Sequence, residues 1–215
     1  MRKAIPGKKL AVGLVVLLLA TIAALLFGYL NGRVLRGEIL VELPIPSDSG
    51  PAERLLIRRG FDQRRHLFML REHGEEEVWP ERRVLYGLQE GTQPVIAGGL
   101  VLVRTRRSSG LHETHAFNVS DGVFKWAGAT PAPPFDATGG PGPTFVVGDV
   151  VTEVYVGDPG EIIGVNLGDG AELYRAQVSI PAGAAVTLEG ERLRIASTPP
   201  LCFSQRSGVP TDCAP

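Results

Sequence analysis

An internal repeat is the feature of this sequence that most restricts its fold. The stretch Phe117–Trp126 aligns without a gap on Val165–Tyr174, with Asn on Asn, Asp-Gly on Asp-Gly and an aromatic residue on an aromatic residue. The offset is 48 residues, which is 174 minus 126. In a weaker upstream copy, Gly74 precedes Gly122 by the same offset and Trp79 is shifted by one residue. Periods of about 20–50 residues indicate units that bury their apolar faces by stacking on one another.

The segments around the repeat are typical of β-strands. Short runs rich in Val, Ile, Leu and Phe alternate with glycine-containing turns, and no later window has the period of an amphipathic helix. The predicted strands include Leu100–Thr105, His115–Val119, Val150–Val156, Glu161–Leu167 and Arg192–Ala196. Dipeptides suited to positive φ separate several of them: Gly98-Gly99, Asp121-Gly122, Asp169-Gly170 and Glu189-Gly190. A hairpin at Ala184–Ala196 is interpreted as the start of a further unit that the C-terminus truncates.

A unit of two hairpins and about 48 residues has the size of a propeller blade. The motifs Ala116-x-Asn-x-x-Asp-Gly-x-x-x-Trp126 and Gly164-x-Asn-x-x-Asp-Gly-x-x-x-Tyr174 resemble the repeat of quinoprotein-like (PQQ-like) β-propellers. That repeat usually reads Ala-x-Asp-x-x-Thr-Gly-x-x-x-Trp, so Asn here replaces Asp, Asp replaces Thr, and one Trp is Tyr. The resemblance covers roughly 67–196 and implies blades, with the repeat aromatics Trp79, Trp126 and Tyr174 filling the spaces between them.

The size of the domain leaves its architecture open. Family enzymes that carry the quinone cofactor resemble rings of many blades, whereas roughly 180 residues after the N-terminal segment have room for about three or four. We therefore expect a mainly β fold with three alternatives. The first is a minimal propeller closed by a strand at Glu38–Leu43, and the second is an open stack of sheets capped by a partner. The third is a β-sandwich, in which the sequence repeat would not correspond to repeated blades.

An uncharged segment near the N-terminus predicts a membrane anchor. Leu10–Leu30 reads LAVGLVVLLLATIAALLFGYL, and about 21 helical residues span a hydrocarbon layer of about 30 Å. The alternative is a cleaved signal peptide, but its apolar region normally runs only about 7–15 residues, and no small-x-small site follows Phe27. We expect an uncleaved signal-anchor helix.

Cations near the segment predict its orientation. Arg2, Lys3, Lys8 and Lys9 precede it, against Arg33 and Arg36 after it, so the N-terminus should be cytoplasmic and the domain periplasmic or otherwise extracytoplasmic. The expected organisation is a cytoplasmic N-terminus at 1–9, a transmembrane helix at 10–30, a tether at 31–51, a β-repeat domain at 52–196 and a C-terminal tail at 197–215.

The two cysteines suit an oxidising compartment. Cys202 and Cys213 flank a turn that contains Pro and Gly, where a disulfide would close a short loop. The alternative is two unpaired thiols. A zinc site is not expected, because the gap between them lacks the usual ligand spacing and no histidine is near.

The residues that invite a catalytic interpretation have simpler explanations. The sequence His112-Glu-Thr-His115 is one residue short of a helical metal motif, and residues three apart on a strand point to opposite faces. Asp121 and Asp169 each precede a turn glycine and are interpreted as turn residues. We therefore expect no enzyme activity and no catalytic, metal or cofactor site, and no small-molecule substrate.

Charge is distributed unevenly along the chain. Residues 51–110 hold eleven Arg against eight acids, whereas 111–215 hold five cations against twelve acids; the net charge of −1 gives no reason to expect nucleic acid. Candidate contacts with an acidic partner or lipid head groups are Arg58, Arg59, Arg64 and Arg65, although solvated strand edges also carry charge. The loop Ala127–Thr144, with Phe135 as an apolar anchor, is a second candidate; the alternative is a linker between blades.

These features predict a non-catalytic, membrane-anchored scaffold or accessory subunit of a larger membrane protein complex. Its expected partners are other membrane protein subunits and the lipid bilayer. The first alternative is a propeller-type assembly factor that binds client proteins, and a less favoured one is an oxidoreductase with a quinone cofactor.

Overall fold

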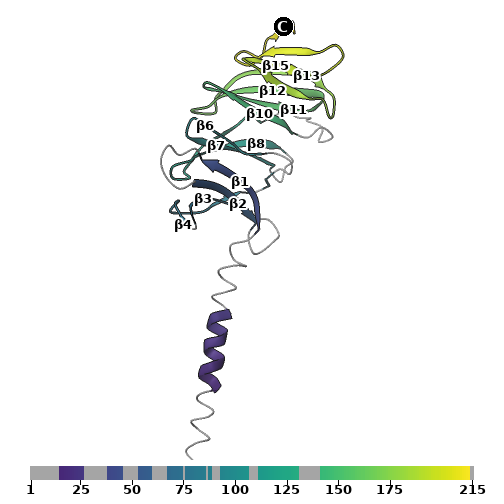
Figure 1. Ribbon diagram of the computed structural model, residues 1–215. Helices are drawn as coiled ribbons and strands as arrows, with labels where there is room; N and C mark the ends of the chain where they lie inside the picture. The colour runs from purple at the N-terminus through teal and green to yellow at the C-terminus, as the bar shows by residue number, and fades with distance from the viewer. Residues whose placement is uncertain are drawn as a thin grey trace, which may run out of the picture.

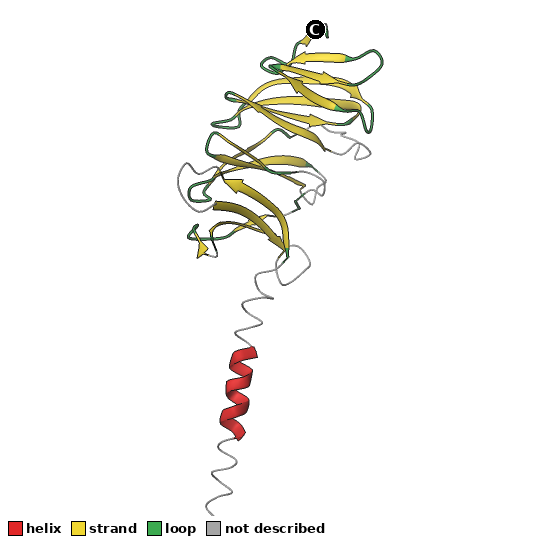
Figure 2. Cartoon of the chain, in the orientation of Figure 1, coloured by secondary structure: helices red, strands yellow, loops and turns green. Residues whose placement is uncertain are grey.

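The computed structural model describes residues 15–26, 38–45, 53–59, 67–74, 76–85, 87–88, 93–106, 111–130 and 141–213 (Figure 1). From residue 38 onward the described elements are strands and the turns between them, and the strands pair antiparallel in four sheets (Figure 2). The prediction of a mainly β fold is confirmed.

Each sheet is a meander of consecutive strands. Sheet 1 contains β1 (Ile39–Ile45), β2 (Glu53–Arg59), β3 (Leu67–His73), β4 (Glu76–Glu77) and β5 (Arg83–Leu85), with β4 and β5 both paired to β3. Sheet 2 contains β6 (Val95–Ala97), β7 (Leu100–Arg106), β8 (His112–Asn118) and β9 (Phe124–Gly128). Sheet 3 contains β10 (Pro141–Val147), β11 (Val150–Tyr155), β12 (Gly157–Asn166) and β13 (Glu172–Ile180). Sheet 4 contains β14 (Val186–Glu189), β15 (Arg192–Ile195), β16 (Leu201–Ser204) and β17 (Pro210–Thr211).

The sheets stack face to face in chain order, with one apolar core at each junction. Leu55, Ile57 and Met69 of sheet 1 pack with Val101 and Val103 of sheet 2. Successive side chains on a strand point to opposite faces, so the next residues of β7 face the other way. Leu100 and Leu102 accordingly enter the core shared with sheet 3, and β7 is buried along almost its whole length.

The third core lies between sheets 3 and 4. Val154 and Ile162 of sheet 3 pack against Leu193, Ile195 and Phe203 of sheet 4. The burial along β14 and β15 then alternates between strand residues, as expected where only one face of a sheet is covered.

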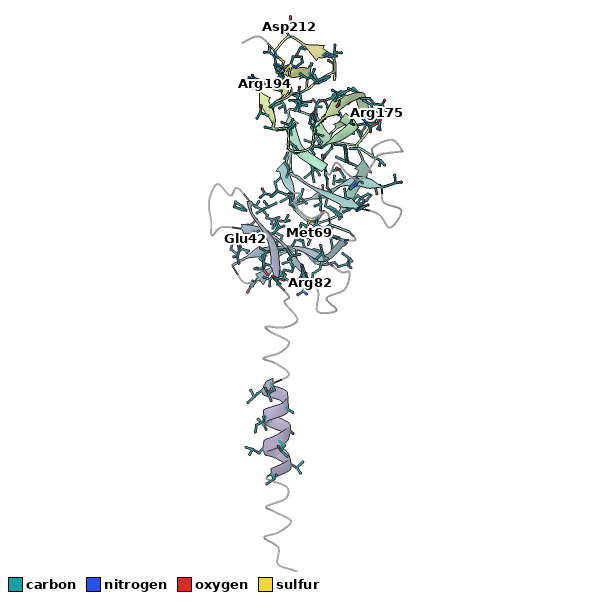
Figure 3. All side chains as sticks on the ribbon, turned by 90° about the vertical axis from the view of Figure 1, so that its right-hand side faces the viewer. Glu42, Met69, Arg82, Arg175, Arg194 and Asp212 are labelled. Carbon is teal, nitrogen blue, oxygen red and sulfur yellow. A yellow bond between two sulfur atoms is a disulfide. The ribbon has the colours of Figure 1, made fainter. Side chains whose placement is uncertain are left out.

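The stack is open rather than closed into a ring. Glu42 and Arg82 of sheet 1 lie at the opposite end of the domain from Arg194 and Asp212 of sheet 4 (Figure 3). The predicted strand at Glu38–Leu43 is β1, which pairs with β2 inside sheet 1 and does not join the last sheet. Of the three predicted architectures, the open stack of sheets, a partial propeller, is the one observed.

Two predicted boundaries differ from the structure. β1 lies within the span predicted as the tether 31–51, so sheet 1 begins at Ile39. β16 and β17 lie within the predicted tail 197–215 and complete sheet 4, so the hairpin at Ala184–Ala196 does not begin a truncated unit. The prediction stopped too early because the fourth unit is shorter than the 48-residue period.

The N-terminal helix is described at residues 15–26, inside the predicted span Leu10–Leu30. Within the part of the chain that the structure describes, no helix is long and apolar enough to cross a membrane. The remaining residues of the predicted span lie outside the described ranges.

Candidate functional site: the surfaces of the sheet stack

The repeat aromatics connect each sheet to the next by one recurring contact. The indole Nε1–H of Trp79 donates to the carbonyl of Val119, 2.8 Å away, in the following sheet. Trp126 donates in the same way to Leu167, also at 2.8 Å. The Tyr174 hydroxyl donates to the carbonyl of Gln205 at 2.6 Å.

Each ring also lies on a glycine of the turn that it reaches. A Cβ at Gly122 would come within 2.6 Å of the Trp79 ring, and one at Gly170 would come within 2.6 Å of Trp126. Gly208 is covered by Tyr174 in the same manner, and all three glycines have positive φ. The predicted role of these aromatics as fillers between successive sheets therefore agrees with their positions, including that of Trp79 despite its shift.

The far face of sheet 4 lacks the features that would receive another sheet. Asp212 lies four residues after Gly208, the position that Trp126 and Tyr174 occupy after their own turn glycines. Thr187, Glu189 and Arg194 line this face, together with small residues, around a shallow hollow of about 430 Å³. This face of sheet 4 is therefore polar, and no other described sheet covers it.

A disulfide fastens the last strand of sheet 4. Cys202 lies on β16 and bonds to Cys213 just beyond β17, with the two Cα atoms 5.3 Å apart. The closed loop is short, so the bond is expected to stabilise the domain by about 2–3 kcal/mol. The predicted disulfide is present, and it secures the edge that no further sheet covers.

The outer face of sheet 1 carries a network of ion pairs. Glu72 is buried and lies 2.8 Å from Arg58 and 3.4 Å from Arg54, which also pairs with Glu42 at 3.0 Å. The Arg58 side chain is only 12% exposed, so most of its surface is unavailable to a partner.

The other predicted contact residues have different positions. Arg59 is about half exposed and lies 3.4 Å from Glu38. Arg64, Arg65 and Phe135 lie outside the described residues, as does most of the loop Ala127–Thr144. Their proposed roles as partner contacts therefore stay predictions.

A buried ion pair, which no sequence pattern had predicted, lies between sheets 2 and 3. Arg104 on β7 pairs with Glu153 on β11, and both side chains are almost fully buried. Arg104 donates to the carbonyl of Gly142 at 2.7 Å and lies over the Tyr155 ring, 4.8 Å from its centroid. Burial lowers the pKa of Arg104 to about 10, so the guanidinium remains charged at neutral pH.

The hydroxyls of two threonines complete the shell around Glu153. Thr114 donates to one carboxylate oxygen and Thr144 to the other, each at 2.9 Å. The Tyr155 hydroxyl donates to the carbonyl of Ala129 at 2.7 Å, and Ala129 has a positive φ of 55°. These side-chain hydrogen bonds connect sheets 2 and 3, so the cluster has a structural role.

The two histidines of the His-Glu-Thr-His sequence do not converge. His112 is buried near Tyr155, with ring centroids 6.1 Å apart, whereas His115 lies beside Phe117 and Phe124 on the other face of β8. Burial lowers the pKa of His112, with Arg106 and Arg104 lowering it further. The prediction that these residues point to opposite faces is confirmed.

The two aspartates of the repeat act as turn residues, as predicted. Asp121 accepts a hydrogen bond from the Val123 N–H at 2.9 Å, and Asp169 accepts one from Ala171 at 3.0 Å. The bond to Val123 holds the pKa of Asp121 below its usual range.

The fold was compared with those of known proteins. No protein-family model matches the sequence, and no curated protein is significantly similar to it. BamB from Moraxella catarrhalis has 18% sequence identity and a TM-score of 0.52, over 77% of this chain and 50% of that one. A europium-containing methanol dehydrogenase has 14% identity and a TM-score of 0.41, over 68% and 28% of the two chains. Quinohemoprotein alcohol dehydrogenase from Comamonas testosteroni has 10% identity and a TM-score of 0.43, over 72% and 33%.

BamB is a PQQ-like β-propeller protein, so the resemblance read from the repeat is confirmed at the level of the fold. The present chain spans half the length of the BamB chain that it matches.

Proposed function

We propose that this protein is a non-catalytic, membrane-anchored scaffold or accessory subunit of a larger membrane protein complex, with its β domain docked on the extracytoplasmic face. The observation that carries the proposal is the short connection between the uncharged segment Leu10–Leu30 and an open stack of sheets. The eight residues 31–38 extend over at most about 30 Å, so β1 would be held near the bilayer surface. Tethering of this kind raises the effective concentration of the domain beside membrane partners.

The form of the stack supports a role in binding rather than in chemistry. Its aromatic residues and its buried ion pair all join one sheet to the next, and they leave the outer strands and the end faces as the surfaces that can meet other molecules. The Cys202–Cys213 disulfide suits an oxidising compartment outside the cytoplasm.

A second candidate function is that of an assembly factor that binds client proteins. The similarity in fold to BamB favours it. The two candidates differ in the lifetime of the complex, because a subunit keeps one partner in fixed stoichiometry whereas an assembly factor exchanges its clients.

The topology can be tested by labelling introduced cysteines. Lys125 is exposed and forms no ion pair with another described residue. A Lys125→Cys variant should therefore react with a membrane-impermeant thiol reagent on intact cells. An Ala4→Cys variant should react only after the membrane is opened, because residues 1–9 are expected in the cytoplasm. The reverse pattern of labelling would contradict the orientation.

The subunit role can be tested by extraction in a mild detergent. The full-length chain should co-purify with at least one membrane protein in constant stoichiometry, and the ratio should survive dilution. Partners that are lost on dilution but trapped by cross-linking would favour the assembly factor. Elution of the chain alone, even after cross-linking, would contradict both functions.

A further inference from the structure

The outer edge of sheet 3 differs from the outer edges of the other sheets. β13 is nine residues long, and among the described strands it pairs only with β12. The outermost strands of the other sheets are much shorter: β4 has two residues, β5 three, β9 five and β17 two. A long strand with one open side presents unpaired backbone N–H and C=O groups at alternate residues.

β13 also has fewer of the features that usually protect an edge. Proteins blunt open strands with proline, bulges, short length or outward charges. Pro44 lies within β1, Pro141 and Pro143 lie within β10, and β6 and β14 have only three and four residues. In β13 there is no proline. Its register against β12 shifts near both ends of the pairing and is regular over residues 174–178.

The charged residue in this regular stretch does not guard the open side. Arg175 lies 2.8 Å from Glu161 on β12 and 2.6 Å from Glu172, and it donates to the carbonyl of Thr130 at 3.0 Å. These three contacts hold its guanidinium over the body of the stack. Among the described strands, none pairs with the backbone edge beside it.

The side chains of β13 alternate between an exposed face and a partly buried face of sheet 3. Arg175, Gln177 and Ser179 are exposed, whereas Ala176 and Val178 are partly buried against the core between sheets 3 and 4. A strand added beside β13 would place apolar side chains next to this core and polar ones next to Gln177.

We infer that the open edge of β13 binds an extended segment of a partner protein, which adds to sheet 3 as a further antiparallel or parallel strand. The backbone groups identify the occupant, because only an extended chain satisfies a row of alternating donors and acceptors at the spacing of a strand. The expected segment alternates apolar and polar residues. This inference rests on the proposed function, since it names the surface by which the docked domain holds its partner.

Two proline variants test the edge directly. The N–H groups of neighbouring strand residues point to opposite sides, so Ala176→Pro and Gln177→Pro remove N–H groups from different sides of β13. The variant that loses a bond to β12 should melt at a lower temperature than the wild type. The other should melt like the wild type and lose binding at the open edge.

The probe is a labelled peptide of about eight residues with alternating threonine and valine, measured by fluorescence anisotropy on the detergent-solubilised full chain. The edge variant should bind it at least tenfold more weakly than the wild type. A second measurement leaves the protein unchanged: two isomeric peptides carry N-methyl groups on opposite sides of the backbone. The isomer methylated on the pairing side should bind at least tenfold more weakly than the other.

Several outcomes would overturn the inference. They are absence of peptide binding by the wild type, equal binding of the two methylated isomers, and equal binding by the thermally unaffected proline variant. A dimer of the wild type that this variant abolishes in sedimentation would assign the edge to a second copy instead. A wild-type chain that binds no peptide but co-purifies with a membrane protein would reject the edge alone. A wild-type chain that binds the peptide but elutes without any partner would reject the proposed function alone.

Discussion

Replacing Trp126 by alanine is expected to lower the free energy of unfolding by about 3–5 kcal/mol. The side chain is 5% exposed, lies on Gly170 of the next sheet and donates to the carbonyl of Leu167, so its loss leaves a cavity and an unpaired acceptor. Urea denaturation followed by circular dichroism measures the change. Trp126→Phe should cost less, because it keeps most of the apolar ring and removes only the hydrogen bond.

The matched control is Phe124, two residues earlier on the same strand and 51% exposed. Phe124→Ala should change stability by less than about 1 kcal/mol. Gly170→Ala addresses the other side of the contact, because its Cβ would meet the indole ring. The double variant of Trp126 and Gly170 should be less destabilised than the sum of the single ones. A small effect at Trp126, or strict additivity, would contradict the proposed junction.

Replacing Glu153 by leucine is expected to destabilise the domain by about 3–5 kcal/mol, because it leaves the Arg104 guanidinium buried without its carboxylate. The double variant Arg104→Met with Glu153→Leu removes both charges and fills the space with apolar atoms. It should recover most of the loss, to within about 1–2 kcal/mol of the wild type. Urea denaturation of the three variants measures the difference.

An exposed ion pair on sheet 4 serves as the control for the buried one. Arg194 lies 3.2 Å from Glu189 on sheet 4, with side chains 45% and 50% exposed. Glu189→Ala should cost less than about 1 kcal/mol, since water screens an exposed pair. If Glu153→Leu costs no more than Glu189→Ala, the buried pair does not hold sheets 2 and 3 together.

The turns of the stack are a case in which local sequence was sufficient. Asn118 and Asn166 each begin a turn closed by the same two backbone hydrogen bonds, and the glycines that end these turns have positive φ. Glycine adopts that conformation without a Cβ penalty, and Asp121 and Asp169 bond the backbone two residues on. All of these interactions lie within a few residues, so a single sequence contains them.

The fourth turn shows the limit of the repeat as a signal. Ser204 and Gly208 form the same two backbone hydrogen bonds, but Gly208 follows Gly170 by only 38 residues, which is 208 minus 170. An alignment at an offset of 48 therefore missed it. The spacing of four residues from Ser204 to Gly208, equal to that from Asn118 to Gly122, was the signal that could have found it.

The amino-acid sequence by itself determined the β class of the domain, its repeat unit, the aromatics that end the first three units and the pairing of Cys202 with Cys213. Each of these depends on short-range spacing or on a pattern of apolar residues. Only the tertiary structure decided that four sheets form an open stack, because ring closure depends on how the ends of the stack lie in space. It also decided which arginines are buried. Arg58 meets Glu72 on the neighbouring strand and Arg104 meets Glu153 in the next sheet, and no local sequence pattern distinguishes these arginines from solvated ones.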